Sequence, residues 1–145
     1  MIHDTTAELD PVTTIETQPR TILIIDDDDA QSFALAWRLQ SQGYETLTSN
    51  EGRRGLILAK SERPDVILLD LQLPDMDGLE ICEQLSDSSA TCGIPVIIVS
   101  GSDRSDIVKK SRAAGCDYYL RKPYDPSVVL MLVERAIERL RDHGL

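Results

Sequence analysis

Four groups of polar residues in this chain could together act on a phosphoryl group. Each group comes just after a short apolar run, so acids, a hydroxyl and a lysine stand at equivalent places along the chain. They are Asp26, Asp27, Asp28 and Asp29 after residues 22–25, Asp70 after residues 66–69, Ser100 after residues 96–99, and Lys122, followed by Pro123, after residues 118–120. Several carboxylates near one another stay ionised at neutral pH only when cations join them. These residue types therefore predict a site that combines carboxylates, a lysine and a metal ion.

Mg²⁺ is the cation that suits such a site. It is a hard ion that takes oxygen ligands and keeps several waters, and Lys122 would add one further positive charge. Asp70 is the candidate nucleophile on phosphorus, because the metal and the lysine would neutralise the transferring phosphoryl oxygens. Ser100 could donate a hydrogen bond to one of these oxygens.

Each group also has a plainer interpretation when it is taken alone. A run of aspartates is typical of a turn that leads into a helix, because acids favour helix N-termini. Asp70 could be a turn acid before Pro74, and Ser100 before Gly101 is common in loops. The joint placement of these residues after separate apolar runs favours a functional site over four unrelated loops.

The apolar runs predict buried strands, and the stretches between them predict helices. The predicted strands are residues 22–25, 44–48, 66–69, 96–99 and 118–120, and the helices lie near residues 30–42, 53–60, 79–85, 107–114 and 126–140. Five strands alternating with five helices predict an α/β fold with a doubly wound parallel sheet and right-handed crossovers. With the strand order 2-1-3-4-5, Asp26, Asp27 and Asp70 would converge where the strand order reverses.

The first predicted helix has an apolar face that suggests which side is buried. Ala30, Phe33, Ala34 and Trp37 have the spacing i, i+3, i+4 and i+7, and Leu35 and Leu39 widen the stripe. We expect Trp37 to pack in the core. Gly43 is placed to end this helix, and Asp125 with Pro126 is placed to begin the last one.

Composition limits the class of protein. The chain has 145 residues, enough for one domain, and its net charge of −10 with a pI near 4.5 argues against general nucleic-acid binding. No apolar run is long enough for a membrane span, and the start lacks the pattern of a secretory signal. Three cysteines without metal-site spacing predict reduced thiols in a cytoplasmic protein.

The domain boundaries follow from the same pattern. Residues 1–19 hold five threonines, four acids and no Lys or Arg, and we expect a flexible tail. Residues 20–142 form the predicted domain, and residues 143–145 are its C-terminal end. The start at Met1 and the end soon after the last helix favour a complete chain, and a domain cut from a longer protein is the alternative.

Four stretches of the sequence resemble the receiver domain of two-component response regulators. They are ILIIDDDDA (22–30), RPDVILLDLQLPDMDGLEIC (63–82), IPVIIVSGS (94–102) and AAGCDYYLRKPYD (113–125). The resemblance covers residues 20 to 142, and it implies the flavodoxin-like (βα)5 receiver fold of stand-alone, chemotaxis-regulator-like proteins. The separations from Asp70 to Ser100 and from Asp70 to Lys122 also fit the family.

The resemblance implies roles for the acidic residues. Asp70 resembles the phosphoacceptor, and Asp26 and Asp27 resemble the acidic pair that organises Mg²⁺, with Asp27 as the direct ligand. The main-chain carbonyl of Gln72 resembles a further metal ligand. Gly78, in the loop after Asp70, is expected to have a positive φ angle.

Four other residues match functional positions of the family. Lys122 resembles the active-site lysine, and Pro123 implies a cis Lys122–Pro123 bond. Ser100 stands at the switch Ser/Thr position, and Tyr119 stands at the switch aromatic.

The family implies a phosphorylation switch rather than an enzyme. A sensor histidine kinase or a histidine phosphotransfer protein would donate the phosphoryl group to Asp70, with intrinsic autophosphorylation and autodephosphorylation chemistry. The fourth helix, fifth strand and fifth helix would then change their surface for a downstream protein target or a homodimer. Neither direct DNA binding nor membrane binding is expected.

Two alternatives to the switch remain. The first is a pseudo-receiver, an interaction module that takes no phosphate, although the presence of Asp27, Asp70 and Lys122 together speaks against it. The second is a phosphatase with an aspartyl-phosphate intermediate, because Asp26 and Asp28 match an Asp-x-Asp pattern after a first strand. The chain leaves no room for the cap domain of such enzymes.

Overall fold

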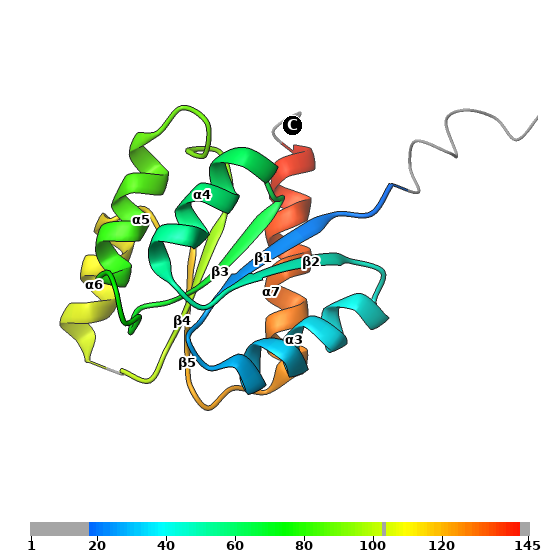
Figure 1. Ribbon diagram of the computed structural model, residues 1–145, viewed down its shortest axis with the longest axis horizontal. Helices are drawn as coiled ribbons and strands as arrows, with labels where there is room; N and C mark the ends of the chain where they lie inside the picture. The colour runs from blue at the N-terminus through cyan, green and yellow to red at the C-terminus, as the bar shows by residue number, and fades with distance from the viewer. Residues whose placement is uncertain (1–17, 103, 143–145) are drawn as a thin grey trace, which may run out of the picture.

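A five-stranded parallel sheet forms the centre of the molecule, as the computed structural model shows for residues 18–102 and 104–142 (Figure 1). The strand order is β2-β1-β3-β4-β5, which confirms the predicted order 2-1-3-4-5. The strands are β1 (Thr21–Ile25), β2 (Glu45–Ser49), β3 (Val66–Asp70), β4 (Val96–Ser100) and β5 (Tyr118–Arg121). Their register pairs Ile25 of β1 with Leu69 of β3. The next residues, Asp26 and Asp70, therefore lie side by side at one edge of the sheet.

Five helices cover the two faces of the sheet. They are α3 (Asp29–Ser41), α4 (Gly52–Glu62), α5 (Gly78–Asp87), α6 (Ser105–Ala113) and α7 (Pro126–Asp142). Helices α3 and α7 lie on one face, and α4, α5 and α6 lie on the other (Figure 1). This arrangement confirms the doubly wound α/β fold.

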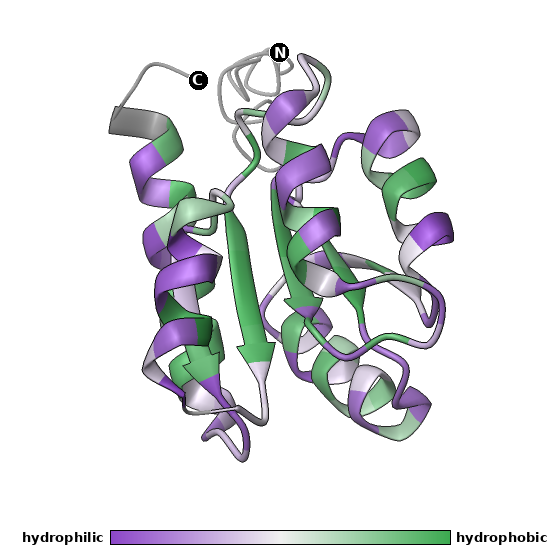
Figure 2. Ribbon diagram, turned by 90° about the vertical axis from the view of Figure 1, so that its left-hand side faces the viewer, coloured by the Kyte–Doolittle hydropathy of each residue, from purple (hydrophilic) through white to green (hydrophobic). Residues whose placement is uncertain are grey.

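The core has two halves because alternate residues of each strand point to opposite faces of the sheet. On the side of α3 and α7, Ile22, Ile24 and Leu68 pack against Leu39 and Val133. On the other side, strand residues such as Leu23, Ile25 and Ile98 pack against α4 and α5. The central strands β1, β3 and β4 are strongly apolar, whereas the helices alternate between apolar and polar residues (Figure 2). The buried β3 and β4 have the continuous apolar sequences expected of central parallel strands.

Helix α3 is rotated relative to the sequence-based prediction. Phe33 and Trp37 are 75% and 63% exposed, so the expectation that Trp37 packs in the core is wrong. The buried residues of α3 are Ser32, Leu35, Ala36 and Leu39, so the prediction that Leu35 and Leu39 belong to the apolar face is confirmed. The buried residues keep the spacing of a helical stripe, and this stripe lies to one side of Phe33 and Trp37 on the helix surface.

The ends of the helices follow the expected local chemistry. The Asp28 side chain accepts a hydrogen bond from Gln31 N (3.1 Å) and caps α3, and Gly43 has a φ of 94° just beyond its end. Asp125 likewise accepts from Ser127 N at 3.0 Å at the start of α7.

Gly78 differs from the prediction of a positive φ. It is the first residue of α5, and only Gly43 and Gly115 among the described glycines have positive φ. A side chain at Gly78 would collide with the Leu71 backbone. Close packing therefore accounts for this glycine.

The predicted N-terminal tail lies mostly outside the described residues, which begin at residue 18. Described secondary structure runs from Thr21 to Asp142. Within residues 18–102 and 104–142, no helix combines the length and the apolar character that a membrane crossing requires.

Candidate functional site

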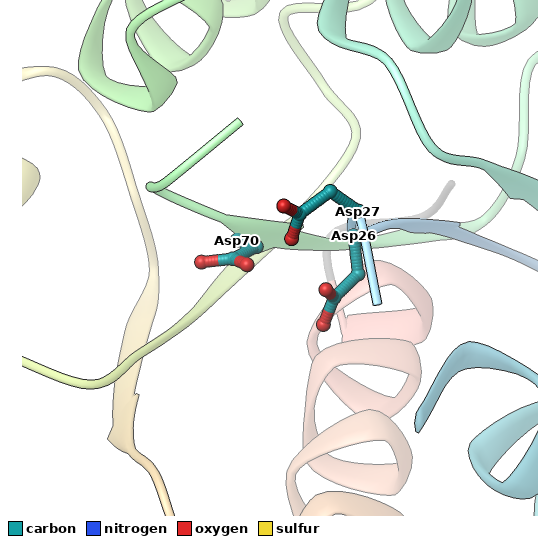
Figure 3. A group of neighbouring side chains, drawn as sticks. All are labelled: Asp26, Asp27 and Asp70. Atoms are coloured by element: carbon teal, nitrogen blue, oxygen red, sulfur yellow. The ribbon is translucent and has the colours of Figure 1, made fainter. Parts of the chain in front are cut away.

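Three carboxylates meet at the carboxyl edge of the sheet. Asp26 and Asp27 follow β1, and Asp70 ends β3, so two neighbouring strands bring them together (Figure 3). One oxygen from each carboxylate lies within 4.8 Å of the others. Asp26 and Asp70 are buried and Asp27 is exposed, so the cluster is open on one side.

Backbone hydrogen bonds fix the position of Asp26. Its N–H donates to the carbonyl of Ser49 at 3.0 Å, which continues the pairing of β1 with β2 by one residue. Its Oδ1 accepts from Asp28 N at 2.9 Å. Asp28 and Asp29 belong to the cap and first turn of α3, so they do not join the cluster of three.

Lys122, which directly follows the outer strand β5, adds a positively charged ammonium to the cluster. Its Nζ donates to Asp26 Oδ2 at 3.1 Å and to Asp70 Oδ2 at 3.4 Å. Its backbone N–H donates to the Ser100 carbonyl at 2.7 Å, which holds the residue beside the end of β4. The Lys122–Pro123 peptide bond that follows is cis.

Burial and charge shift the proton affinities of these groups. Burial raises the pKa of Asp70 above its ordinary value, and the N–H of Gln72 and the Lys122 ammonium offset only part of this effect. Burial alone would lower the pKa of Lys122, but its hydrogen bond to Asp26 and the charges of Asp70 and Asp26 raise it overall. Lys122 is therefore protonated at neutral pH, and an ionised Asp70 benefits from a further cation.

Gln72 and Ser100 lie beside Asp70. The Gln72 N–H donates to Asp70 Oδ1 at 3.0 Å, so the loop after β3 turns back over the carboxylate. Ser100 is buried at the end of β4, where the register places Val99 opposite Asp70. Its Oγ accepts from Ser102 N at 3.3 Å.

Tyr119 is outside the acidic cluster. Its hydroxyl donates to the Ser102 carbonyl at 2.7 Å, and its ring packs partly buried on the α5 side of the sheet. It therefore connects β5 to the loop that follows Ser100. No hydrogen bond between Tyr119 and the acids occurs among the described residues.

Sequence reasoning missed two features near the cluster. One is an apolar groove of roughly 570 Å³ on the exposed side of α3, lined by Phe33, Trp37, Lys122, Pro123 and Tyr124 together with neighbouring α3 residues. The other is Asp75, whose carboxylate binds the start of α4. Helical spacing alone could not reveal which stripe of α3 is exposed, and Asp75 and its partners are too far apart in sequence to give a local signal.

The donor set fits a hard divalent cation. It offers carboxylate oxygens from three residues, one of them exposed and thus open to water, and it has no sulfur or imidazole ligand. Mg²⁺ takes oxygen ligands of this kind and retains waters, so it fits better than a metal that favours thiolates or histidines.

The strand order and the acidic cluster at the edge of the sheet define a flavodoxin-like α/β domain with its site at the switch point. The chain belongs to the response regulator receiver domain family, whose model matches residues 22–134. This is a family of signalling modules of two-component systems, which confirms the resemblance found in the sequence.

Individual proteins show the same relationship. The polar-differentiation response regulator DivK of Brucella anthropi is 32% identical over 125 residues, which are 86% of this chain and 96% of DivK. The transcriptional regulatory protein PhoP of Bacillus subtilis is 31% identical over 83% of this chain, which spans only about half (49%) of PhoP. A CheY-like receiver domain from Methanospirillum hungatei has a TM-score of 0.83 at 29% identity, covering 88% of this chain and 100% of that one.

Proposed function

We propose that this chain is a phosphorylation switch that accepts a phosphoryl group on Asp70 from a sensor histidine kinase or a histidine phosphotransfer protein. The observation that carries this proposal is the contact of Lys122 with both Asp26 and Asp70, beside a carboxylate cluster suited to Mg²⁺. Membership of the receiver domain family supports it further.

The proposed chemistry is an in-line transfer to a carboxylate oxygen. An Asp70 oxygen forms a bond to phosphorus while the bond from phosphorus to the donor's imidazole nitrogen breaks. The donor's imidazole carries a proton on its other ring nitrogen, so it leaves as a neutral ring. Lys122 pairs with the negative charge that gathers on the phosphoryl oxygens. Mg²⁺ held by Asp26, Asp27, Asp70 and the main-chain carbonyl of Gln72 would neutralise charge on the carboxylates and the phosphoryl group.

The proposed switch uses Ser100 at the end of β4 and Tyr119 on β5. Ser100 would donate its hydroxyl hydrogen to a phosphoryl oxygen on Asp70, which draws the loop after β4 toward the site. The Tyr119 hydroxyl is bonded to Ser102 in that same loop, so this movement would break or redirect its hydrogen bond. A population shift of this kind would alter the surface formed by α6, β5 and α7, where a downstream target or a second copy would bind.

The groove beside α3 is the surface that a protein donor would cover. A donor must bring its phosphohistidine into contact with Asp70, and Lys122 belongs both to the acidic cluster and to the groove. A specific interface covers about 800 Å² on each partner, so it extends well beyond the site itself. The exposed rings of Phe33 and Trp37 are the apolar anchors that interfaces of this kind favour.

The remaining expectations belong to the same proposal. A cytoplasmic location is supported by three free thiols at Cys82, Cys92 and Cys116. The absence of direct DNA binding is supported by the net charge of −10. The output of this chain would then depend on a protein partner.

Intact mass after incubation with acetyl phosphate and Mg²⁺ tests this function. Wild-type protein should gain one phosphoryl group, and Asp70→Asn and an EDTA-treated sample should gain none. If neither acetyl phosphate nor phosphorylated histidine kinases modify the wild type, the pseudo-receiver interpretation replaces this one. Catalytic turnover of an external phosphate ester would instead indicate a phosphatase.

A further inference from the structure

A carboxylate in the loop after Asp70 reaches across to a helix on the other side of the site. Asp75 lies between β3 and α5, and its Oδ1 accepts a hydrogen bond from Gly52 N at 2.7 Å while Oδ2 accepts from Arg53 N at 2.9 Å. These N–H groups start α4 and have no intrahelical partner. The preceding residue, Glu51, supplies no side-chain cap. Asp75, which lies 23 positions after Gly52 in the sequence, caps the helix instead.

The start of α4 is in turn fixed to the strand end that carries Asp26. The Ser49 carbonyl accepts from Asp26 N at 3.0 Å, and the Ser49 hydroxyl donates to the Glu51 carbonyl at 2.7 Å. One turn later, Gly55 lets α4 lie directly on β1, because a Cβ there would approach Ile25 to 2.6 Å. Hydrogen bonds and close packing therefore connect the start of α4 to the strand end that carries Asp26.

The loop that holds Asp75 is also a compact unit. Gln72 and Asp77 form an antiparallel bridge across its base, and Gly78 N donates to the Leu71 carbonyl at 3.1 Å. Gln72 therefore belongs to the same closed loop as Asp75. The pair of hydrogen bonds from Asp75 to α4 joins this loop to the unit that contains Asp26.

We propose that Asp75 is a positioning residue that sets the distance between Gln72 and the Asp26–Asp27 pair by tying the loop after β3 to α4. The inference rests on the proposed function, since the shared task of these residues is cation binding. Asp75 itself would touch neither the cation nor the phosphoryl group. Residues that hold metal ligands in place change metal affinity roughly 10- to 100-fold when they are substituted.

The test compares two substitutions of the same kind in the full-length chain. Asp75→Asn keeps the size of the side chain but lacks one of the two acceptor oxygens. Asp65→Asn is the matched control, because the Asp65 carboxylate also accepts from a distant backbone N–H, that of Thr21 at 2.8 Å, before β3 rather than after it. Magnesium chloride is titrated calorimetrically into each protein, and amide hydrogen exchange is measured without metal.

We expect Asp75→Asn to raise the dissociation constant for Mg²⁺ about tenfold. In the metal-free protein, the amides of Gly52, Arg53 and Gln72 should exchange faster. Asp65→Asn should bind Mg²⁺ within about twofold of wild type and should leave those three amides unchanged.

Three results would count against the inference. Equal Mg²⁺ affinity of wild type and Asp75→Asn would overturn it while leaving the proposed function intact. If Asp65→Asn weakened Mg²⁺ binding as much as Asp75→Asn does, the loss of affinity would reflect general destabilisation, and the inference would also be overturned. A wild-type chain that binds no Mg²⁺ would overturn the metal site of the proposed function, and this inference with it.

Discussion

The ammonium of Lys122 lies 3.1 Å from the carboxylate of Asp26, although 96 positions separate the two residues in the sequence. Parallel strands with helical crossovers make this contact possible, because they bring every carboxyl strand end to one edge of the sheet. The Lys122 ammonium therefore has a carboxylate partner other than the proposed phosphoacceptor.

Replacement of Lys122 should slow phosphorylation without removing the acceptor. Lys122→Met keeps the length of the side chain but not its charge, and both charge and hydrogen bonding from Lys122 act on Asp70. We expect phosphorylation by acetyl phosphate to slow roughly 100-fold, as when one charge-stabilising donor is removed from an active site. The rate is followed by intact mass, with Lys60→Met on the exposed side of α4 as the control. A rate within twofold of wild type would contradict the role of Lys122.

Asp70→Asn should stabilise the metal-free protein at neutral pH. Burial raises the pKa of Asp70 in the folded chain, so the folded state holds this proton more tightly than the unfolded state does. At pH 7 the ionised Asp70 carboxylate therefore lowers the free energy of unfolding. This loss of stability disappears as the pH falls through the pKa that Asp70 has in the folded state. The melting temperature of the variant should exceed that of wild type at pH 7, and the difference should vanish in acid below both pKa values.

Magnesium should reverse this order of stability. A ligand at 100 times its dissociation constant stabilises the folded state by about 2.7 kcal/mol, and Asp70→Asn has lost one of the proposed ligands. Wild type should therefore gain more from Mg²⁺ than the variant does. Asp87→Asn, exposed at the end of α5, serves as the control in both thermal scans. A variant that is less stable than wild type without metal would contradict this account of the charge cluster.

The aromatic side of α3 should matter for a protein donor and not for a small one. Phe33→Ala and Trp37→Ala remove exposed rings, so the free energy of unfolding should change by less than about 0.5 kcal/mol. Transfer from a phosphorylated histidine phosphotransfer protein that modifies wild type should slow roughly tenfold. Phosphorylation by acetyl phosphate should be unaffected.

Ile57→Ala is a matched control for these two variants. Ile57 is 65% exposed on α4, which covers the opposite face of the sheet. If Ile57→Ala slows the protein donor as much as Trp37→Ala does, the groove beside α3 has no particular role in docking.

The three thiols should differ sharply in reactivity. Burial raises the pKa of Cys82 to about 12 and that of Cys116 to about 11, whereas Cys92 is exposed. Because the thiolate is the reactive form, one thiol should react rapidly with Ellman's reagent in the native protein at pH 8, and three in denaturant. Cys92→Ser should abolish the rapid phase, and a rapid phase that survives in this variant would contradict the assignment.

Much of this fold could be predicted because its central strands β1, β3 and β4 are short, continuous apolar runs that end at polar residues. The residues after Ile25, Leu69 and Val99 could be placed at one edge of the sheet from the pattern alone, and this placement brought Asp26, Asp27 and Asp70 together. The signal is strong because a central strand is buried on both faces of the sheet, so its sequence is an almost continuous apolar run.

The sequence-based predictions failed where one sequence pattern was compatible with two different structures. The apolar residues of α3 form one wide stripe, and periodicity cannot tell which part of it, that of Trp37 or that of Leu39, faces the sheet. A glycine at position 78 could be required either by a positive φ or by close packing, and the sequence does not distinguish the two. The structure shows that close packing against Leu71 is the reason. Asp75 depends on a partner in another helix, so no local pattern could identify it.

The exposed position of Trp37 has a practical consequence. It is the single tryptophan of the chain, and it shares its groove with Lys122 and Tyr124. The fluorescence of the native protein therefore comes chiefly from one ring beside the candidate active site, and its emission maximum and its quenching by acrylamide both depend on contact with water. Any partner that binds this face would displace that water and change the fluorescence of Trp37. The association rate could therefore be measured by stopped-flow fluorescence without attaching a dye.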